Sequence, residues 1–399
     1  MSEWIQKSLG EITSYLAKGI PPKYVDELNE NTIYVLNQKC NRDFVISYEQ
    51  ARIHDLQQKK VSEEKMIKPG DVLINSTGEG TAGRIAQIWD IPHPTTTDGH
   101  MILIRPTEEV DKLYYGYAVK ANQVLIESLA EGSTGQTEVN KKRLQDEVII
   151  SFPVDKEEQH RIALMLEDID RKIAINNQIN RNLYEQAVAL FESMYQDYSE
   201  RKIGELDIFV TDYVANGSFA SLKENVSILE EKDYAYFIRN VDLKAKEFPR
   251  FVNQHSYEFL SKSKLVGGEV IISNVGDVGS VFLCPKLDGP MTLGNNMIML
   301  TSPKHNNYLY LFFKSYIGQG KIDGITGGSA QPKFNKTDFK SLEINYPDDS
   351  QVDEFNEKTS ALLDMISKLD EENKRLTALR DSLLPKLMSG ELDVSNLDI

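Results

Sequence analysis

Two long stretches of the chain place mainly apolar residues alternately four and three positions apart. One stretch lies within residues 154–200 and the other within 348–399. The repeating positions are Ile162, Leu166, Ile169, Ile173, Asn176, Asn180, Leu183, Ala187, Leu190 and Met194 in the first, and Val352, Phe355, Thr359, Leu362, Ile366, Leu369, Asn373, Leu376, Arg380 and Leu383 in the second. This alternation is typical of helices that pack side by side in a coiled coil. We therefore predict two long helices, each of roughly 40 residues and about 60 Å, that pair with each other.

Both predicted helices begin shortly after a proline and have a capping candidate there. Pro153 precedes Asp155 in the first, and Pro347 precedes Ser350 in the second. Asn180 and Asn373 occupy the same phase of the two repeats. A buried amide at such a position can fix the register of a coiled coil. The alternative is that both asparagines sit at loosely packed, hydrated positions, and the sequence leaves both interpretations open.

Motifs of the first half of the chain return in the second half, in the same order and about 192 to 198 residues later. The pairs are Leu9-Gly10-Glu11-Ile12 with Ile203-Gly204-Glu205-Leu206, Pro69-Gly70-Asp71-Val72 with Gly267-Gly268-Glu269-Val270, Gly132-Ser133-Thr134-Gly135-Gln136 with Gly327-Gly328-Ser329-Ala330-Gln331, and Phe152-Pro153 with Tyr346-Pro347. Such ordered self-similarity marks a tandem duplication.

The parts of the chain outside the predicted helices contain short β-type runs between glycine or proline turns, such as 71–74 and 148–150. We predict an α+β fold with two tandem-duplicated mixed α/β domains, residues 1–153 and 201–347. Two long coiled-coil helices, within 154–200 and 348–399, separate these domains and give the molecule pseudo-two-fold symmetry.

The composition fits a globular protein without membrane spans or a cysteine-built metal site. Hydrophobic residues make up 40% of the chain, and no apolar run approaches the roughly 18–20 residues that a membrane span needs. The two cysteines, Cys40 and Cys284, lie far apart, which excludes a disulfide framework and a cysteine-built zinc site. The first residues lack the layout of a signal peptide. We therefore expect a cytoplasmic protein.

The net charge of −16 disfavours DNA binding, because contacts to phosphates come from Lys and Arg. The two predicted helical segments, 154–200 and 348–399, carry −12 of this charge. The remaining parts are therefore close to neutral, and a locally positive face is possible there.

The chain closely resembles the specificity subunits of type I restriction–modification systems, and the resemblance covers its whole length. It rests on the duplicated motifs given above, on Glu158-Gln159-His160-Arg161-Ile162-Ala163 after Phe152-Pro153, and on the ending Leu383-Leu384-Pro385-Lys386-Leu387-Met388-Ser389-Gly390-Glu391-Leu392. The second copy departs from the first at Ala330, which replaces Gly135, and at 351–353. The roles of individual residues in the family can therefore be assigned less securely to the second half of the chain.

The resemblance implies a DNA specificity subunit without catalysis of its own. Each domain would be a target-recognition domain that reads one half of an asymmetric bipartite site in double-stranded DNA. The two long helices would pair antiparallel and set the spacing between the halves. They would also dock two methyltransferase subunits, and through those the restriction–translocation subunits. S-adenosylmethionine, ATP and Mg would belong to these partners, so we expect no cofactor or metal in this chain.

Candidate DNA contacts are neutral or basic polar side chains on predicted loops, because these side chains can pair with base edges or phosphates. In the first domain they are Ser76, Thr77, Thr81, Arg84, Thr95, Thr96, Thr97, His100, Ser133, Thr134, Gln136, Lys141, Lys142 and Arg143. In the second domain they are Asn274, Ser280, Asn295, Asn296, Ser329, Gln331, Lys333 and Lys336.

Several enzyme motifs are missing. The glycine-rich runs 78–83 and 276–279 lack the Lys-Ser/Thr of a P-loop, and a hairpin turn explains them better. The six histidines show no metal-ligand spacing, and no Asn/Asp-Pro-Pro-aromatic motif of an adenine methyltransferase occurs. Two rival functions remain: a coiled-coil adaptor that binds protein without DNA readout, which the negative charge favours, and an enzyme with an unrecognised nucleotide site at the glycine runs.

Overall fold

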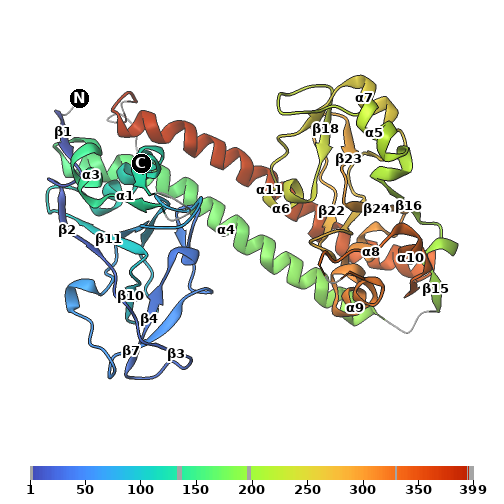
Figure 1. Cartoon of the computed structure of the whole chain (residues 1–399), viewed down its shortest axis with the longest axis horizontal. Coiled ribbons are helices and arrows are strands. Elements are labelled where there is room, and N and C mark those ends of the chain that lie inside the picture. The colour runs from blue at the N-terminus through green and yellow to red at the C-terminus, as the bar shows by residue number, and fades with distance from the viewer. Residues whose placement is uncertain (1–2, 133–136, 196–198, 329, 393, 395–399) are drawn as a thin grey trace. The chain divides into compact units, whose positions relative to one another are not determined.

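The computed structural model describes residues 3–132, 137–195, 199–328, 330–392 and 394 (Figure 1). The chain forms two compact units. The first unit consists of Met1–Ile175 with Asn373–Ile399, and the second of Asn176–Glu372. Each unit therefore contains one globular segment together with a part of each long helix.

The two long helices are α4 (Lys156–Met194) and α11 (Asp349–Met388), both inside the ranges predicted for them. Asp155 caps α4 as expected, because its carboxylate accepts from the backbone N–H of Glu157 at 3.0 Å. The predicted cap of α11 was wrong, since Ser350 lies inside the helix. The cap is Asp348, whose carboxylate accepts from the N–H groups of Ser350 and Gln351 at 3.0 and 2.9 Å.

The predicted helix seam is confirmed, because all its positions are buried or half-buried. In the first unit, Ile162 and Leu166 of α4 share a core with Leu384 and Leu387 of α11. The pairing is antiparallel in each unit. In the second unit, Ala187 and Phe191 of α4 share a core with Val352 and Phe355 of α11.

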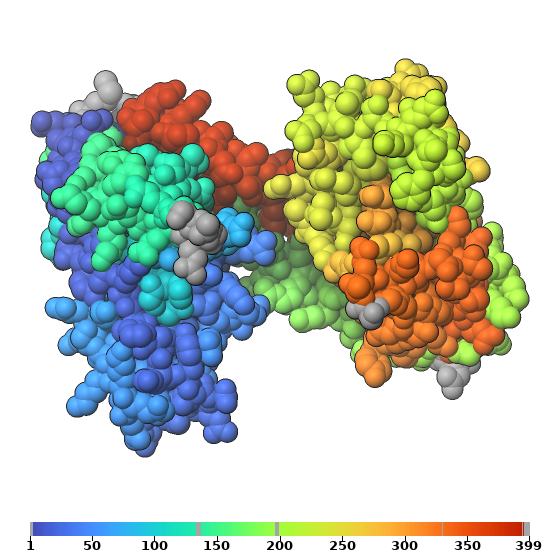
Figure 2. All heavy atoms as spheres, viewed as in Figure 1, coloured from blue at the N-terminus to red at the C-terminus, as the bar shows by residue number. Residues whose placement is uncertain are grey.

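Two four-stranded sheets and the pair of β1 with β14 form the framework of the described part of the first unit. β1 (Trp4–Ser8) pairs with β14 (Ile149–Pro153), and a four-stranded antiparallel sheet has the order β2 (Thr13–Lys18), β11 (Met101–Pro106), β8 (Asp71–Asn75) and β9 (Ile85–Ile88). The third sheet has the order β10 (Thr95–Thr97), β4 (Thr32–Leu36), β7 (Arg52–Asp55) and β3 (Tyr24–Val25). Figure 2 shows the residues of β3, β4 and β7 in the blue lobe at the foot of this unit.

Short elements complete the first unit. The small strand pairs are β5 (Asn41–Arg42) with β6 (Val45–Ile46), and β12 (Ala130–Glu131) with β13 (Glu138–Val139). The helices are α1 (Lys112–Ala121), α2 (Gln123–Ser128) and α3 (Lys141–Glu147). In Figure 1, α1 and α3 lie at the opposite end of the unit from β3 and β7.

The second unit repeats this plan, which confirms the predicted duplication. β15 (Glu200–Lys202) pairs with β25 (Glu343–Asn345), and β16 (Phe209–Asp212), β24 (Met297–Thr301), β21 (Val270–Ser273) and β22 (Val281–Leu283) follow the order of the first unit's antiparallel sheet. The remaining sheet has the order β17 (Ile228–Leu229), β19 (Phe251–Val252), β18 (Ala235–Ile238), β23 (Met291–Leu293) and β20 (Lys264–Leu265). Its helices are α5 (Phe219–Asn225), α6 (Asn240–Ala245), α7 (Gln254–Phe259), α8 (Asn306–Lys314), α9 (Tyr316–Ile325) and α10 (Lys336–Ser341).

The helices of the described residues include none that is long and apolar enough to cross a membrane.

Candidate nucleic-acid interface

Three loops of the first unit are joined by backbone hydrogen bonds. They are the β8–β9 connection, the turn before β11 and the segment that leads into α3. Ser76 N–H donates to the carbonyl of His100 at 2.8 Å, and Val139 N–H donates to the carbonyl of Ser76 at 2.8 Å. We call residues 76–84, 98–100 and 137–143 the first loop cluster.

The second unit joins its matching loops in the same way. Asn274 N–H donates to the carbonyl of Asn296 at 3.1 Å, and Phe334 N–H donates to the carbonyl of Asn274 at 3.1 Å. We call residues 274–280, 294–296, 327–328 and 330–336 the second loop cluster. Because the same bonds recur at matching repeat positions, the duplication preserved the backbone scaffold of these loops, although their side chains differ.

The glycine-rich runs form hairpin connections, as the sequence predicted. Gly83 and Gly279 have φ values of +86° and +87°, in the left-handed region that glycine adopts without strain. Their N–H groups donate to the carbonyls of Asn75 and Ser273 at 2.8 and 3.0 Å. A Cβ at Gly83 would lie 2.6 Å from the Cα of Glu127. These glycines therefore serve tight turns and close packing.

Four predicted contacts of the first unit are buried, and the prediction that they face DNA is wrong for them. Ser76, Thr95, Thr96 and Thr97 are at most 1% exposed. The threonine run forms strand β10 instead of a loop, because it pairs with β4 and internal carbonyls satisfy two of its hydroxyls. Thr95 donates to His93 O at 2.6 Å and Thr96 to Lys65 O at 2.8 Å.

Other predicted contacts of the first unit reach the surface of its loop cluster. His100 is exposed, and its Nδ1 lies 2.9 Å from the Oγ1 of the half-buried Thr77. Arg84 and Thr81 are half-buried, and Arg84 donates to the carbonyl of Gly80 at 3.1 Å. Donors and acceptors of several kinds therefore lie together on one surface of the unit.

The three consecutive cations at the start of α3 have different surroundings. Lys141 and Lys142 are exposed, and Lys142 Nζ lies 3.8 Å from a carboxylate oxygen of Asp146. Arg143 instead forms ion pairs with Glu147 at 2.6 Å and Glu131 at 2.5 Å. Its hydrogen bonds to Glu147 and Glu131 raise the pKa of the guanidinium and lower the pKa of both carboxyls. The two lysines are therefore better placed than Arg143 to contact phosphates.

The second loop cluster also divides into exposed side chains and side chains bonded to the protein. Asn295, Asn296, Gln331 and Lys333 are exposed. Asn274 donates to the carbonyl of Phe334 at 3.2 Å, Ser280 donates to Asp277 at 2.6 Å, and Lys336 pairs with Asp212 at 2.9 Å. The remaining candidates, Ser133, Thr134, Gln136 and Ser329, lie outside the described residues.

Sequence reasoning missed two segments that border the loop clusters. Residues 37–51 connect β4 to β7, and residues 239–250 connect β18 to β19. Asn41 of the first segment donates to Asn75 Oδ1 at 3.1 Å, and Lys244 of the second pairs with Asp277 at 2.6 Å. Hydrogen bonds from Lys244 and Ser280 lower the pKa of Asp277 to about 2. The sequences of these two segments do not match each other. Only their position between strands that do correspond in the two units could have pointed to them.

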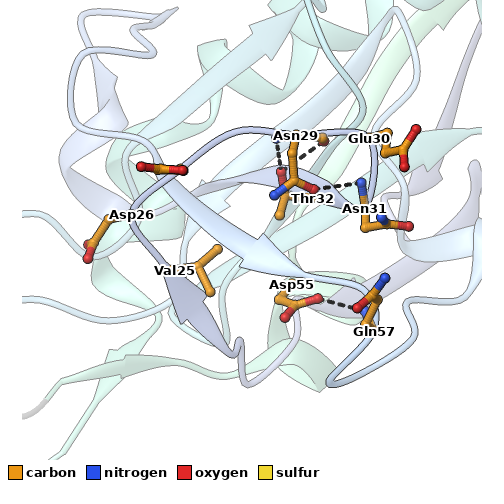
Figure 3. A pocket seen from close by; sticks show the side chains of 9 residues that line it. Val25, Asp26, Asn29, Glu30, Asn31, Thr32, Asp55 and Gln57 are labelled. Atoms are coloured by element: carbon orange, nitrogen blue, oxygen red, sulfur yellow. Dashed lines mark hydrogen bonds between the residues drawn. The ribbon is translucent and has the colours of Figure 1, made fainter.

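A surface depression in the first unit is unsuited to nucleic acid (Figure 3). Carboxylates line much of it, and these are Asp26, Glu27, Glu30 and Asp55. A hydrogen bond from Gln58 lowers the pKa of Asp55, which therefore stays ionised. Negative charge there repels phosphate groups. Among the described residues, no group of three His, Cys, Asp or Glu side chains could hold a metal ion.

Comparisons with known proteins agree with the duplicated architecture. A family model described as the type I restriction modification DNA specificity domain matches residues 1–185 and 214–379. The specificity subunit of the type I restriction enzyme HindI from Haemophilus influenzae is 22% identical over 470 residues, which cover 98% of this chain and 100% of that protein. The MjaIX specificity subunit from Methanocaldococcus jannaschii is 22% identical over 419 residues, 99% of this chain and 95% of that protein.

The fold is also similar to a solved structure. The S subunit of a type I restriction–modification system from M. genitalium aligns with a TM-score of 0.58 at 16% sequence identity. The alignment covers 99% of this chain and 97% of that one.

Proposed function

Because the chain belongs to the type I restriction–modification DNA specificity family, we propose that its two loop clusters each read one half of an asymmetric bipartite site in double-stranded DNA. The observation that carries this proposal is the shared backbone scaffold with unlike side chains. The first cluster presents His100, Thr77 and Arg84, and the second presents Asn295, Asn296 and Lys333. Different donors and acceptors on one scaffold select different bases.

Partner binding is the second part of the proposal. The long helices α4 and α11 dock two methyltransferase subunits, and restriction–translocation subunits join through those. The duplicated plan of the two units supports the binding of two methyltransferase subunits, because each unit offers the same arrangement of elements. S-adenosylmethionine, ATP and Mg are held by the partners, and this chain supplies the DNA specificity without catalysis.

A domain exchange tests the modular readout. Residues 1–153 are replaced with the matching segment of a family member, and the variant is co-expressed with the methyltransferase subunit. Methylation profiling of host DNA is expected to show a change in one half of the motif, because each unit has its own core. Changes in both halves would contradict independent readout. Wild-type methylation without any sequence motif would instead favour the adaptor without DNA readout.

A further inference from the structure

The same connection in the two units has a different structure. Between β4 and β7 the first unit has the hairpin β5–β6, whereas between β18 and β19 the second unit has the helix α6. Both connections contact the glycine-rich hairpin of their own loop cluster, through Asn41 in the first unit and through Lys244 in the second. An element that differs where the scaffold is shared can give the two units different specificities.

The hairpin Asn41–Ile46 is fixed to the base of the first loop cluster. Asn41 is 1% exposed, and its Nδ2 donates to Asn75 Oδ1 at 3.1 Å and to the carbonyl of Arg84 at 3.0 Å. In the preceding residues, the carbonyl of Gln38 accepts from Asn75 Nδ2 at 3.2 Å. A displacement of the hairpin would therefore break hydrogen bonds to buried amides, which is costly.

The turn of this hairpin has an unfavourable backbone conformation that packing maintains. Asp43 and Phe44 have φ values of 52° and 64°, a region in which a bulky residue such as Phe is rare. The Phe44 ring packs at 5.1 Å from the Tyr117 ring, and Lys120 Nζ lies 5.7 Å from its centre. Strained residues of this kind persist where the surrounding structure over-determines them, often at functional sites. Phe44 thus anchors the hairpin on α1.

Outward side chains of this hairpin are available for binding. The Arg42 side chain is 81% exposed, and its ion-pair contact is to Asp43, at 3.8 Å and itself 90% exposed. Such a pair is weak. Val45, opposite Arg42 on the neighbouring strand, is 63% exposed. The exposed Lys39 adds a second cation close by in the sequence.

The corresponding cations of the second unit are engaged by carboxylates. Arg239 pairs with Asp242 at 2.6 Å and Lys244 pairs with Asp277 at 2.6 Å. Lys246 pairs with Asp370 at 2.5 Å. The same place in the fold thus presents a guanidinium with a distant ion-pair partner in the first unit and cations with close carboxylate partners in the second.

We propose that the hairpin Asn41–Ile46 is a DNA-contacting element for the first half-site and that Arg42 contacts the DNA through its guanidinium. This inference rests on the proposed function. A two-stranded ribbon fits the major groove, where arginine pairs with guanine O6 and N7, and the same guanidinium can instead bind a phosphate. Because the turn is fixed by Asn41 and Phe44, Arg42 meets the DNA with little loss of backbone entropy.

The test is Arg42→Ala in the complex with the methyltransferase subunits. DNA affinity is measured over a salt series, and methylated motifs are profiled in cells. Loss of preference at one base of the first half, with roughly a fivefold or greater loss of affinity for the cognate site, indicates a base contact. An equal loss of affinity for all DNA sequences, together with a salt slope of binding that is smaller by about one, indicates a phosphate contact. Either result supports the proposal.

The matched control is Lys60→Ala, which removes one exposed positive charge from the loop after β7 of the same unit. If Arg42→Ala binds and methylates like Lys60→Ala, the inference is overturned. A wild-type complex that methylates a bipartite motif supports the proposed function whichever result Arg42→Ala gives. Failure of the inference about Arg42 can therefore be distinguished from failure of the proposed function.

Phe44→Gly tests the anchoring. Glycine relieves the turn strain and removes the ring that packs on Tyr117, so the protein is expected to stay folded while the hairpin loses its fixed position. Introducing Phe44→Gly into the wild-type protein should weaken DNA binding. Introducing it into the Arg42→Ala variant should change DNA binding little further. Equal weakening in both backgrounds would show that Phe44 does not act through Arg42.

Discussion

Neighbouring side chains of one type differ in their surroundings, and this decides which of them are available for the proposed DNA contacts. Lys141 and Lys142 extend from the start of α3, whereas Arg143 beside them pairs with Glu131 and Glu147. The sequence 141–143 presents three equal cations, but the fold leaves the two lysines better exposed. Charge counts along a sequence therefore overestimate the contacts available to phosphates.

Replacing Lys141 and Lys142 together with Ala is expected to weaken binding to all DNA sequences similarly. The salt slope should fall by about two, because roughly one counterion is released for each phosphate contact. Affinity measured over a salt series on cognate and unrelated DNA checks this. Arg143→Ala is the control, with a smaller effect expected because two carboxylates already neutralise that charge. An altered base preference at unchanged affinity would show that the lysines read bases.

We expect His305 to make the stability of the second unit depend on pH. The imidazole is 4% exposed, stacks on Tyr346 at 4.3 Å and has Nε2 3.2 Å from the carbonyl of Pro347. Burial lowers its pKa below the unfolded value of about 6.5. The unfolded chain then binds the proton more tightly, so stability is lost as the pH falls below about 6.5 and towards the lowered pKa, by at most about 1.4 kcal/mol per pH unit.

The measurement is the free energy of unfolding of wild type and His305→Gln between pH 7.5 and 5. The glutamine variant should lose less stability over this range, because it lacks the titrating group. The carboxyl groups titrate in both proteins and cancel in the difference. Identical pH slopes would exclude a role for His305.

At the scale of elements, polar contacts join the long helices within each unit. In the first unit Arg380 of α11 pairs with Asp170 of α4 at 2.7 Å, and Tyr117 of α1 donates to the same carboxylate at 2.8 Å. In the second unit Asn180 donates to Asp370 at 2.9 Å. This bond favours the interpretation that Asn180 fixes the register, because a slip of either helix would separate the two groups.

Asp170→Ala is expected to lower the free energy of unfolding by about 2–4 kcal/mol. The change leaves Tyr117 without this acceptor and weakens the neutralisation of Arg380, whose side chain is 17% exposed. Denaturant unfolding measures the loss. Asp168→Ala is the control on the same helix. Its side chain is 57% exposed and lies 3.6 Å from Arg171, so a change within about 0.5 kcal/mol is expected. Equal losses in the two variants would rule out the half-buried Tyr117–Asp170–Arg380 network as the cause.

At the scale of the whole molecule, both long helices continue from one unit into the other. α4 passes the unit boundary after Ile175, and α11 passes it after Glu372. These positions allow both helices to be lengthened while the internal contacts of each unit are kept. They therefore provide a test of the proposal that the helices set the spacing between the two half-sites.

Inserting one heptad after Ile175 and one after Glu372 is expected to widen the unspecified gap of the methylated motif. Seven residues lengthen a helix by about 10 Å, which equals up to about three base pairs at roughly 3.4 Å each. The specified bases should stay the same, because neither loop cluster changes. Methylome sequencing gives the motif, and the single insertion in α4, which disrupts the pairing with α11, is the control. An unchanged gap in the double variant would show that the helices do not set the spacing.

The sequence by itself determined the duplication, the two long helices with their seam, and the glycine hairpins. Each of these depends on local periodicity or on a backbone conformation that few residues adopt, so the residues themselves carry the information.

Tertiary structure alone decided which polar side chains face solvent. Thr95, Thr96 and Thr97 have the composition of a loop, but pairing of β10 with β4 buries them. Ser350 resembles a cap, yet Asp348 accepts the N–H groups of Ser350 and Gln351, so the helix begins two residues earlier than a cap at Ser350 implies. Arg42 became a candidate because Asn41 and Phe44 contact segments distant in sequence. The burial and pairing of a side chain depend on what distant segments pack against it, and a local pattern does not contain that information.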